Sequence, residues 1–326
     1  MDNIIAGPGS QQAKILHDTN KSGRETPWAK HKMDAQLLSY ALSLSDPQAG
    51  KRVYDCAQNL WFTRNEEGLL KLKKSQFCRV RMCPICQWRR SLKMYGQLRT
   101  VIEALKKERE EEGKEPYKYI LITLTVRNVP AESLPNELNH ICDAWHNLCH
   151  EKKYKTAIKG SMRSIEITYN KSTNTYHPHI HALLCVLPSY FKSRTYISHQ
   201  EWVDMWIKAA KINYYPQVDV RKAADEEGAI AEAAKYATKP GDYLNASDVD
   251  EMAATVATLH YSCRKRRFAT WAGNMRKTHQ KLHLDDSENG DLIHISDNID
   301  EKKGNPVFRW DWYAGPKLYI GGQRDG

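Results

Sequence analysis

A row of alternating histidines constrains this chain more than any other feature. His177, His179 and His181 are separated by single residues and lead into an apolar run that ends near Leu187. Side chains alternate between the two faces of a β-strand, so all three imidazoles must lie on one face. Imidazoles gathered beside a buried strand suggest a bound divalent metal. The alternative interpretation is a half-exposed strand face that binds nothing.

A turn-rich loop, Asn170–Asn174, precedes the histidine strand and predicts a hairpin. A loop of this length pairs Tyr169 with Tyr176. Glu166 then lies opposite His179, on the same face of the sheet. A carboxylate and two imidazoles suit Mg²⁺, Mn²⁺ or a similar ion and leave coordination positions open. A slip of one residue would move Glu166 to the other face. His177 is the competing third ligand.

The hydrophobic periodicity around this hairpin predicts a β-α-β-β-α-β order followed by one more helix. We expect strands over residues 117–126, 164–169, 176–187 and 217–221, and helices over 132–154, 200–211 and 226–238. Ser198 is expected to cap the second of these helices. The order is that of a ferredoxin-like α+β fold, an antiparallel sheet with helices over one face.

The last predicted helix carries a second group of reactive side chains. Glu232 and Tyr236 are four residues apart, hence neighbours on one helical face, and Lys239 lies one turn beyond. A phenol can attack a phosphodiester if a metal polarises the phosphate. The carboxylate can then activate a later nucleophile, and the amine can stabilise the phosphate. A packing tyrosine among solvated charges is the alternative, and Tyr243 is a rival nucleophile.

Four cysteines predict a structural zinc site. Cys78, Cys83 and Cys86 lie within nine residues, and the last two have the spacing of a zinc knuckle. Cys56, across a predicted hairpin, completes a Cys₄ set. A thiol oxidoreductase uses the same short spacing but needs a thioredoxin-type context that is missing here.

Positive charge is concentrated in two parts of the chain. The net charge is +10, and the segments from Lys71 to Arg99 and from Cys263 to Lys281 contain no acidic residue. Such segments suit phosphate neutralisation, although a merely solvated basic surface is the alternative. No apolar run is long enough to cross a membrane, and no signal peptide is recognised, so we expect a cytoplasmic protein. The candidate DNA contacts are Arg79, Arg81, Arg89, Arg90, Arg127, Arg264, Arg266 and Arg267.

Taken together, the motifs resemble those of the HUH endonucleases. The closest likeness is to the replication initiators of rolling-circle plasmids from Gram-positive bacteria, in the group with one tyrosine and one glutamate. The similarity runs from about residue 50 to about residue 280. The segments that carry it are Phe77–Arg90, Leu121–Asn128, Arg163–Asn170, His177–His181 and Glu232–Lys239.

This resemblance implies a site-specific enzyme that nicks one DNA strand and becomes linked to its 5′ phosphate. It implies His179, His181 and Glu166 as ligands of Mg²⁺ or Mn²⁺, Tyr236 as the nucleophile, and Glu232 as the residue that activates water. The freed 3′-OH would prime synthesis by the host replicative polymerase. A host superfamily 1 helicase would unwind the plasmid origin. The rival interpretations are a conjugative relaxase or transposase, and a non-catalytic zinc-containing DNA-binding regulator.

The expected organisation has four consecutive segments. They are a flexible arm over residues 1–30, a zinc-binding region with a connector helix over 31–112, an HUH nuclease core over 113–245, and a basic helical and aromatic region over 246–326. The aromatic residues of the last segment can pack onto the core or hold subunits of a homo-oligomer together.

Overall fold

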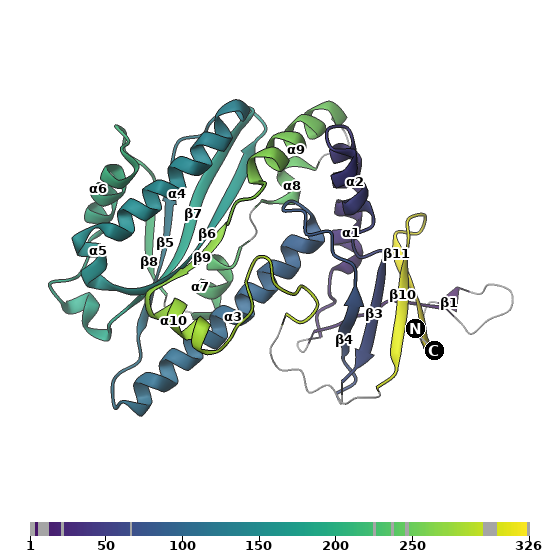
Figure 1. Ribbon diagram of the computed structural model, residues 1–326, viewed down its shortest axis with the longest axis horizontal. Helices are drawn as coiled ribbons and strands as arrows, with labels where there is room; N and C mark the ends of the chain where they lie inside the picture. The colour runs from purple at the N-terminus through teal and green to yellow at the C-terminus, as the bar shows by residue number, and fades with distance from the viewer. Residues whose placement is uncertain are drawn as a thin grey trace. The chain divides into compact units, whose positions relative to one another are not determined.

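The computed structural model describes residues 4–5, 13–20, 23–65, 67–223, 226–235, 238–244, 248–295 and 305–324. Contacts between residues divide the chain into two compact units. The cysteine unit consists of Met1–Arg89, Ala246–Ala257 and Asp291–Gly326, and the histidine unit of Arg90–Asn245 and Thr258–Gly290. The four segments expected from the sequence stay a prediction. The contacts group the chain differently, because its C-terminal strands complete a sheet that begins near its N-terminus (Figure 1).

The histidine unit is built on a five-stranded antiparallel sheet with the order β8-β5-β7-β6-β9. The strands are β5 Lys118–Thr125, β6 Ile158–Asn170, β7 Thr175–Val186, β8 Val218–Lys222 and β9 Ala269–Ala272. Every pair of neighbours runs antiparallel. The expected strands are therefore present, and the α+β class is confirmed.

Helices surround this sheet and connect its strands. They are α3 Pro84–Glu111, which begins in the cysteine unit, α4 Leu134–His150, α5 Lys152–Ala157, α6 His199–Ala210, α7 Glu226–Ala233, α8 Pro240–Tyr243 and α10 Gly273–Lys281, with the short 3₁₀ helices η1 Ala131–Ser133 and η2 Pro188–Lys192. The capping box at Ser198 is formed, because its side chain accepts from the Glu201 N–H while the Glu201 carboxylate accepts from the Ser198 N–H.

The sheet is covered on both faces, which corrects the expectation of helices over one face. Consecutive residues of β5, Ile120, Leu121 and Ile122, are all buried although their side chains alternate between the faces. Side chains of α3, α7 and α10 pack on the face that carries Leu121 and Leu183. Helices α4 and α6 contact each other and reach β7 and β8.

Helix α7 is shorter than the sequence predicts. It ends at Ala233, whereas the alanine-rich pattern continues to residue 238. Thr238 instead forms a parallel β-bridge with Ile167 of β6. The strand that pairs with Thr238 lies about seventy residues earlier in the chain. Local helix propensity therefore cannot predict this pairing.

The cysteine unit contains a six-stranded sheet with the order β1-β2-β11-β10-β3-β4. Its strands are β1 Ile4–Ile5, β2 Ala13–Ile15, β3 Asn59–Arg64, β4 Leu70–Ser75, β10 Val307–Tyr313 and β11 Leu318–Arg324, and its helices are α1 Trp28–Ser43 and α2 Pro47–Tyr54. Helix α9 Val249–Cys263 contributes to both units. The β3–β4 hairpin agrees with the sequence expectation.

Within the described residues of the segment 1–30, β2 pairs with β11 and Trp28 is buried at the start of α1. The partner strand lies about three hundred residues later, so no local pattern predicts this pairing. The aromatic C-terminal residues belong to the same core. Trp310, Trp312 and Tyr319 are buried, and the Tyr319 hydroxyl donates to the carbonyl of Ala57 at 2.6 Å.

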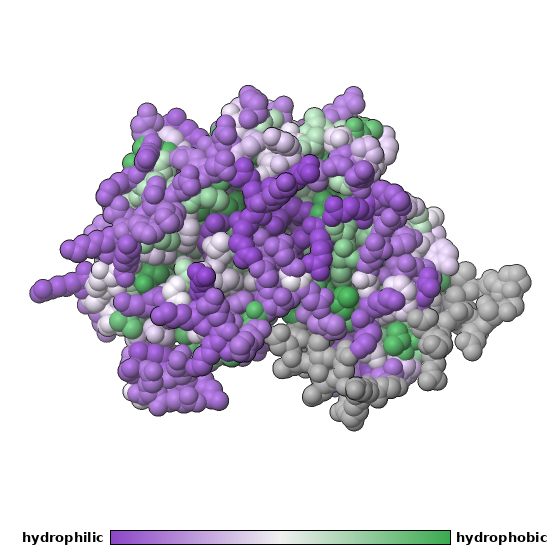
Figure 2. All heavy atoms as spheres, in the orientation of Figure 1, coloured by the Kyte–Doolittle hydropathy of each residue, from purple (hydrophilic) through white to green (hydrophobic). Residues whose placement is uncertain are grey.

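Polar side chains dominate the face of the molecule that is drawn in Figure 2. Figure 2 shows a face covered mostly by hydrophilic side chains, with hydrophobic ones in small separate patches. None of the helices in the described ranges combines the length and the apolarity that a membrane span requires.

Candidate metal sites

Three buried side chains of the β6–β7 hairpin meet on one face of the sheet. Tyr169 pairs with Tyr176 and Glu166 pairs with His179, so the register inferred from the sequence is confirmed. The Glu166 Oε2 atom lies 3.1 Å from His179 Nε2 and 2.9 Å from His181 Nε2. Ligand atoms of all three residues lie within 4.8 Å of one another.

The spacing of these atoms fits a small divalent cation. Donor atoms about 2.1 Å from an octahedral Mg²⁺ lie about 3.0 Å from one another when they are adjacent. The separations of 2.9 and 3.1 Å match that value. The oxygen and each of the two nitrogens are therefore spaced as adjacent ligands of such an ion would be, and three ligands leave positions for others.

Backbone and side-chain groups fix the orientation of both imidazoles. His179 Nδ1 lies 3.1 Å from the carbonyl oxygen of His177, which can only accept a hydrogen bond. Nδ1 must therefore carry a proton, and with a cation bound Nε2 would offer its lone pair to the ion in place of its hydrogen bond to Glu166. His181 Nδ1 lies 3.1 Å from the Thr123 hydroxyl and 3.6 Å from a Glu232 carboxylate oxygen. Thr123 was not among the predicted site residues, although its pairing with His181 across β5 and β7 follows from the strand order.

The Glu166 carboxylate is held in its charged form. Burial alone would raise the pKa of Glu166, but hydrogen bonds from His179, His181 and Lys239 outweigh burial and hold that pKa far below its usual range. The Lys239 ammonium lies 2.9 Å from Glu166 Oε1, and this bond raises the pKa of Lys239. A negative carboxylate that already attracts cations is the charge state a metal ligand requires.

Lys239 and Glu232 both lie at this centre, but they do not lie on one helix as the sequence predicted. Lys239 follows the end of α7 and still reaches Glu166. Glu232 lies beside His181 and forms an ion pair with Lys235. Tyr236 lies outside the described residues.

The rival nucleophile Tyr243 is a packed residue. Only 3% of its surface is exposed, and its hydroxyl lies 3.2 Å from the Thr238 hydroxyl. A phenol held in this way lacks the exposure that attack on a DNA phosphate requires.

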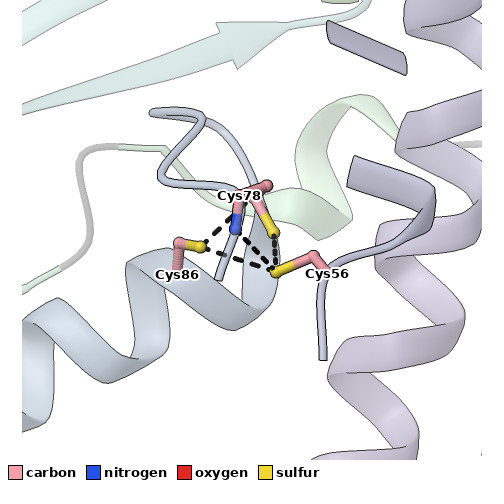
Figure 3. A group of neighbouring side chains, drawn as sticks. Cys56, Cys78 and Cys86 are labelled. Carbon is pink, nitrogen blue, oxygen red and sulfur yellow. Dashed lines mark hydrogen bonds between the residues drawn. The ribbon is translucent and has the colours of Figure 1, made fainter. Parts of the chain in front are cut away.

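The four predicted zinc ligands form a second cluster, in the cysteine unit. Cys56, Cys78, Cys83 and Cys86 are all buried, and each of three sulfur pairs is 3.6 to 3.7 Å apart. Sulfur atoms about 2.3 Å from a tetrahedral Zn²⁺ lie about 3.8 Å apart. Figure 3 shows three of the sulfurs turned toward one another, two from loops and one from the start of α3. The cluster therefore fits a closed structural zinc site.

Two backbone N–H groups and a buried ammonium lie close to the sulfurs. Hydrogen bonds from the neighbouring cysteines raise the pKa of Cys56 and burial raises the pKa of Cys78, so thiolates here would need a bound cation. The backbone N–H of Cys78 donates to the Cys56 sulfur at 3.4 Å, and that of Arg79 donates to the Cys86 sulfur at 3.3 Å. The fully buried Lys32 ammonium donates to the carbonyls of Tyr54 and Cys56, at 2.7 and 2.6 Å. Burial lowers the pKa of Lys32, and nearby cysteine sulfurs act in the opposite direction. A zinc ion with four thiolates carries a charge of about −2, which a buried cation offsets.

Lys32 was not among the predicted site residues, although the sequence contains a signal for it. Lys32 occupies the same helical stripe as Trp28, Ala35 and Leu42 of α1, which are all buried. A lysine on the apolar stripe of a helix needs a negative or carbonyl-rich environment.

Two of the arginines predicted to contact DNA are structural, which corrects that expectation. Arg89 is buried, and its guanidinium donates to the carbonyls of Leu292 and Ile293 at 2.8 and 2.7 Å. Arg90 is buried and donates to the carbonyl of Glu288 at 3.0 Å. Both guanidiniums bind segments two hundred residues away, so their basic sequence context gave no sign of burial.

The remaining arginines differ in their exposure and in the contacts that their side chains make. Arg266 binds the carbonyls of Ser262 and Pro135, which ties α9 to α4. Arg127 lies against the ring of Tyr214, with its guanidinium carbon 3.9 Å from the ring centre. Exposed or half-exposed side chains that remain candidates for phosphate contact are those of Arg79, Arg81, Arg127, Arg264 and Arg267.

Comparisons with known proteins identify the family of this chain. Residues 69–319 match the model of a protein family described as Replication protein. The chain is 34% identical to Protein rep of Bacillus amyloliquefaciens, over 94% of this chain and 97% of that one. It is 35% identical to Protein rep of Streptococcus pneumoniae serotype 2, over 95% of this chain and 96% of that one. No solved structure matches significantly. The chain belongs to this family of replication proteins, and the predicted membership is confirmed.

Proposed function

We propose that this protein initiates rolling-circle replication of a plasmid by nicking one strand of the origin. The observation that carries the proposal is the meeting of Glu166, His179 and His181 on one sheet face in a member of the replication protein family. The strand order 8-5-7-6, with helices between β5 and β6 and between β7 and β8, supports a ferredoxin-like HUH core. The absence of a membrane-spanning helix in the described ranges is compatible with a cytoplasmic protein.

In this proposal, Glu166, His179 and His181 hold Mg²⁺ or Mn²⁺, which when bound would polarise the scissile phosphate. The Tyr236 oxygen attacks the phosphorus, and the bond from phosphorus to the 3′ oxygen breaks. The 3′ oxygen takes up a proton and leaves as a hydroxyl, while the 5′ phosphate stays on Tyr236. One phosphodiester replaces another, so no ATP is required.

Lys239 and Glu232 have separate tasks in the proposed reaction. Lys239, half exposed beside Glu166, neutralises the carboxylate and presents positive charge at the site. Glu232, near His181, is available to accept a proton from water when the phosphotyrosine is hydrolysed at the end of a round. The proposed partners are the plasmid origin, a host superfamily 1 helicase and the replicative polymerase.

A supercoiled plasmid with the cognate origin tests the proposal. With Mg²⁺ or Mn²⁺, the wild-type protein should convert it to the open circle and form a covalent protein–DNA adduct. Tyr236→Phe should do neither, whereas Tyr243→Phe, the matched control, should do both. Glu232→Ala should nick but hydrolyse the adduct slowly. Origin binding without nicking by the wild type would favour a non-catalytic regulator and overturn the proposal.

A further inference from the structure

A cavity of about 550 Å³ lies in the histidine unit, apart from the metal ligands. Strand β9, helix α10 and the turn after α10 form its walls. Its volume is within the range of roughly 300 to 1,000 Å³ that small-molecule sites occupy. None of its lining residues has a role in the nicking reaction proposed above.

An aromatic side chain forms one wall of this cavity. Trp271 is half-buried, its Nε1–H donates to the Ser287 hydroxyl at 3.1 Å, and its ring centre lies 4.9 Å from that of His279. The hydrogen bond and the neighbouring imidazole fix the orientation of the indole. A fixed indole beside an open cavity is a surface on which a planar ring can stack at little entropic cost.

The helix contributes polar groups from one face. Arg276, His279 and Gln280 line the cavity at helical spacings of three and four residues, while Met275 and Thr278 of α10 are buried. The exposed Arg276 guanidinium makes no hydrogen bond or ion pair within the described part of the chain. Its five N–H donors are therefore available to an anion from outside.

The charges around the cavity favour an anionic ligand. Arg267 and Asp286 form an ion pair at its edge, so the one carboxylate among the lining residues is neutralised by its own partner. Arg276 adds a positive charge that forms no ion pair within the described ranges. An aromatic wall, an amide and an uncompensated guanidinium together match an aromatic base that carries a phosphate.

We propose that this cavity binds one unpaired nucleotide of a DNA strand, with the base stacked on Trp271 and the phosphate held by Arg276. Gln280 offers both a donor and an acceptor to the edge of the base. This proposal depends on the proposed function in one respect, which is that the ligand is DNA. A free mononucleotide has the same chemistry and is the competing source.

The position of Trp271 agrees with a DNA strand as the source. Strand β9 pairs with β6, and Trp271 lies opposite Met162, on the sheet face that also carries Glu166. Met162 and Glu166 are four positions apart on β6, which corresponds to roughly 13 Å along the strand. A nucleotide in the cavity would thus lie on the same side of the sheet as the metal ligands.

Fluorescence anisotropy with a labelled oligothymidine, without added Mg²⁺ or Mn²⁺, tests the proposal independently of nicking. Trp271→Ala should weaken binding by about 5- to 100-fold, and Trp271→Phe, which keeps a ring, by less than roughly threefold. Arg276→Gln should weaken binding and reduce the slope of log affinity against log salt by about 0.7. Lys277→Gln, an exposed neighbour on α10 that does not line the cavity, is the matched control and should leave binding unchanged.

Oligonucleotides with a single abasic position separate stacking from a loss of folding. For the wild type, one position should be sensitive to removal of the base, and Trp271→Ala should remove that sensitivity. Competition with thymidine monophosphate distinguishes a DNA strand from a free mononucleotide as the ligand. If the ligand is a DNA strand, the mononucleotide should compete only weakly. The proposal is overturned if Arg276→Gln binds as the wild type does, if no abasic position matters, or if the mononucleotide competes as strongly as the oligonucleotide. Nicking in the same variants is scored separately, so the two proposals can fail independently.

Discussion

Replacing Glu166 with glutamine tests the metal site at its most buried ligand. Only 2% of the Glu166 surface is exposed, and its Oε2 atom lies 2.9 Å from His181 Nε2 and 3.1 Å from His179 Nε2. Glutamine has the same shape and can still accept both imidazole hydrogen bonds, so the hairpin should keep its packing. What disappears is the negative charge at the centre of the cluster.

The expected loss of metal affinity is large because Glu166 supplies the charge that offsets the cation. Groups that contact metal ligands only indirectly change affinity by about 10- to 100-fold when they are mutated. Loss of a direct carboxylate should therefore weaken Mn²⁺ binding by at least about 100-fold, or roughly 2.7 kcal/mol. The lost ion pair with the half-exposed Lys239 should cost less than about 1 kcal/mol of folding stability.

Isothermal titration calorimetry with Mn²⁺ on zinc-loaded protein measures this change. Glu232→Gln is the matched control, because Glu232 Oε1 lies 3.6 Å from His181 Nδ1 and acts on the metal through that ring. It should weaken binding by roughly tenfold. The reasoning is refuted if Glu166→Gln binds Mn²⁺ as tightly as the wild type, or if Glu232→Gln is the more damaging change.

Three further predictions concern stability. Cys86→Ser should abolish stoichiometric zinc binding, measured by atomic absorption, and lower the free energy of unfolding by at least about 4 kcal/mol. A variant that keeps its full zinc content would contradict the Cys₄ site. Burial lowers the pKa of His31 to about 4, so protonation at low pH favours the unfolded state. The free energy of unfolding of the wild type, measured by urea titration, should fall as the pH drops from 6.5 toward 4, by about 2 kcal/mol at pH 5. His31→Phe, which cannot titrate, should lack this component, and identical pH profiles would contradict it. Ser198→Ala should cost about 1 kcal/mol through the lost cap of α6, and an unchanged urea midpoint would refute the capping role.

The sequence predicted the parts of the fold that local patterns determine. The β6–β7 hairpin could be placed to the residue because its loop length, strand alternation and histidine row all agree on one register. The same register places Glu166 beside two imidazoles. The Cys₄ cluster was predictable because three of its ligands are close in the chain.

The errors came from partners that are distant in the sequence. Nothing near Ala233 indicates that the helix ends there, because the competing bridge joins Thr238 to Ile167. Arg89 and Arg90 were expected on the surface, but their guanidiniums bind carbonyls of the segment around residues 288–293. The pairing of β10 with β3 joins strands about 250 residues apart, which periodicity cannot predict.

The central claim is that Tyr236 becomes covalently joined to DNA in a reaction that needs the Glu166, His179 and His181 cluster. The most direct measurement is mass spectrometry of the nuclease-trimmed adduct after proteolysis. The account predicts a single nucleotide joined through its 5′ phosphate to the peptide that contains Tyr236, and no such peptide from Glu166→Gln. A 3′ linkage, a different modified residue, or an equal yield from Glu166→Gln would contradict it.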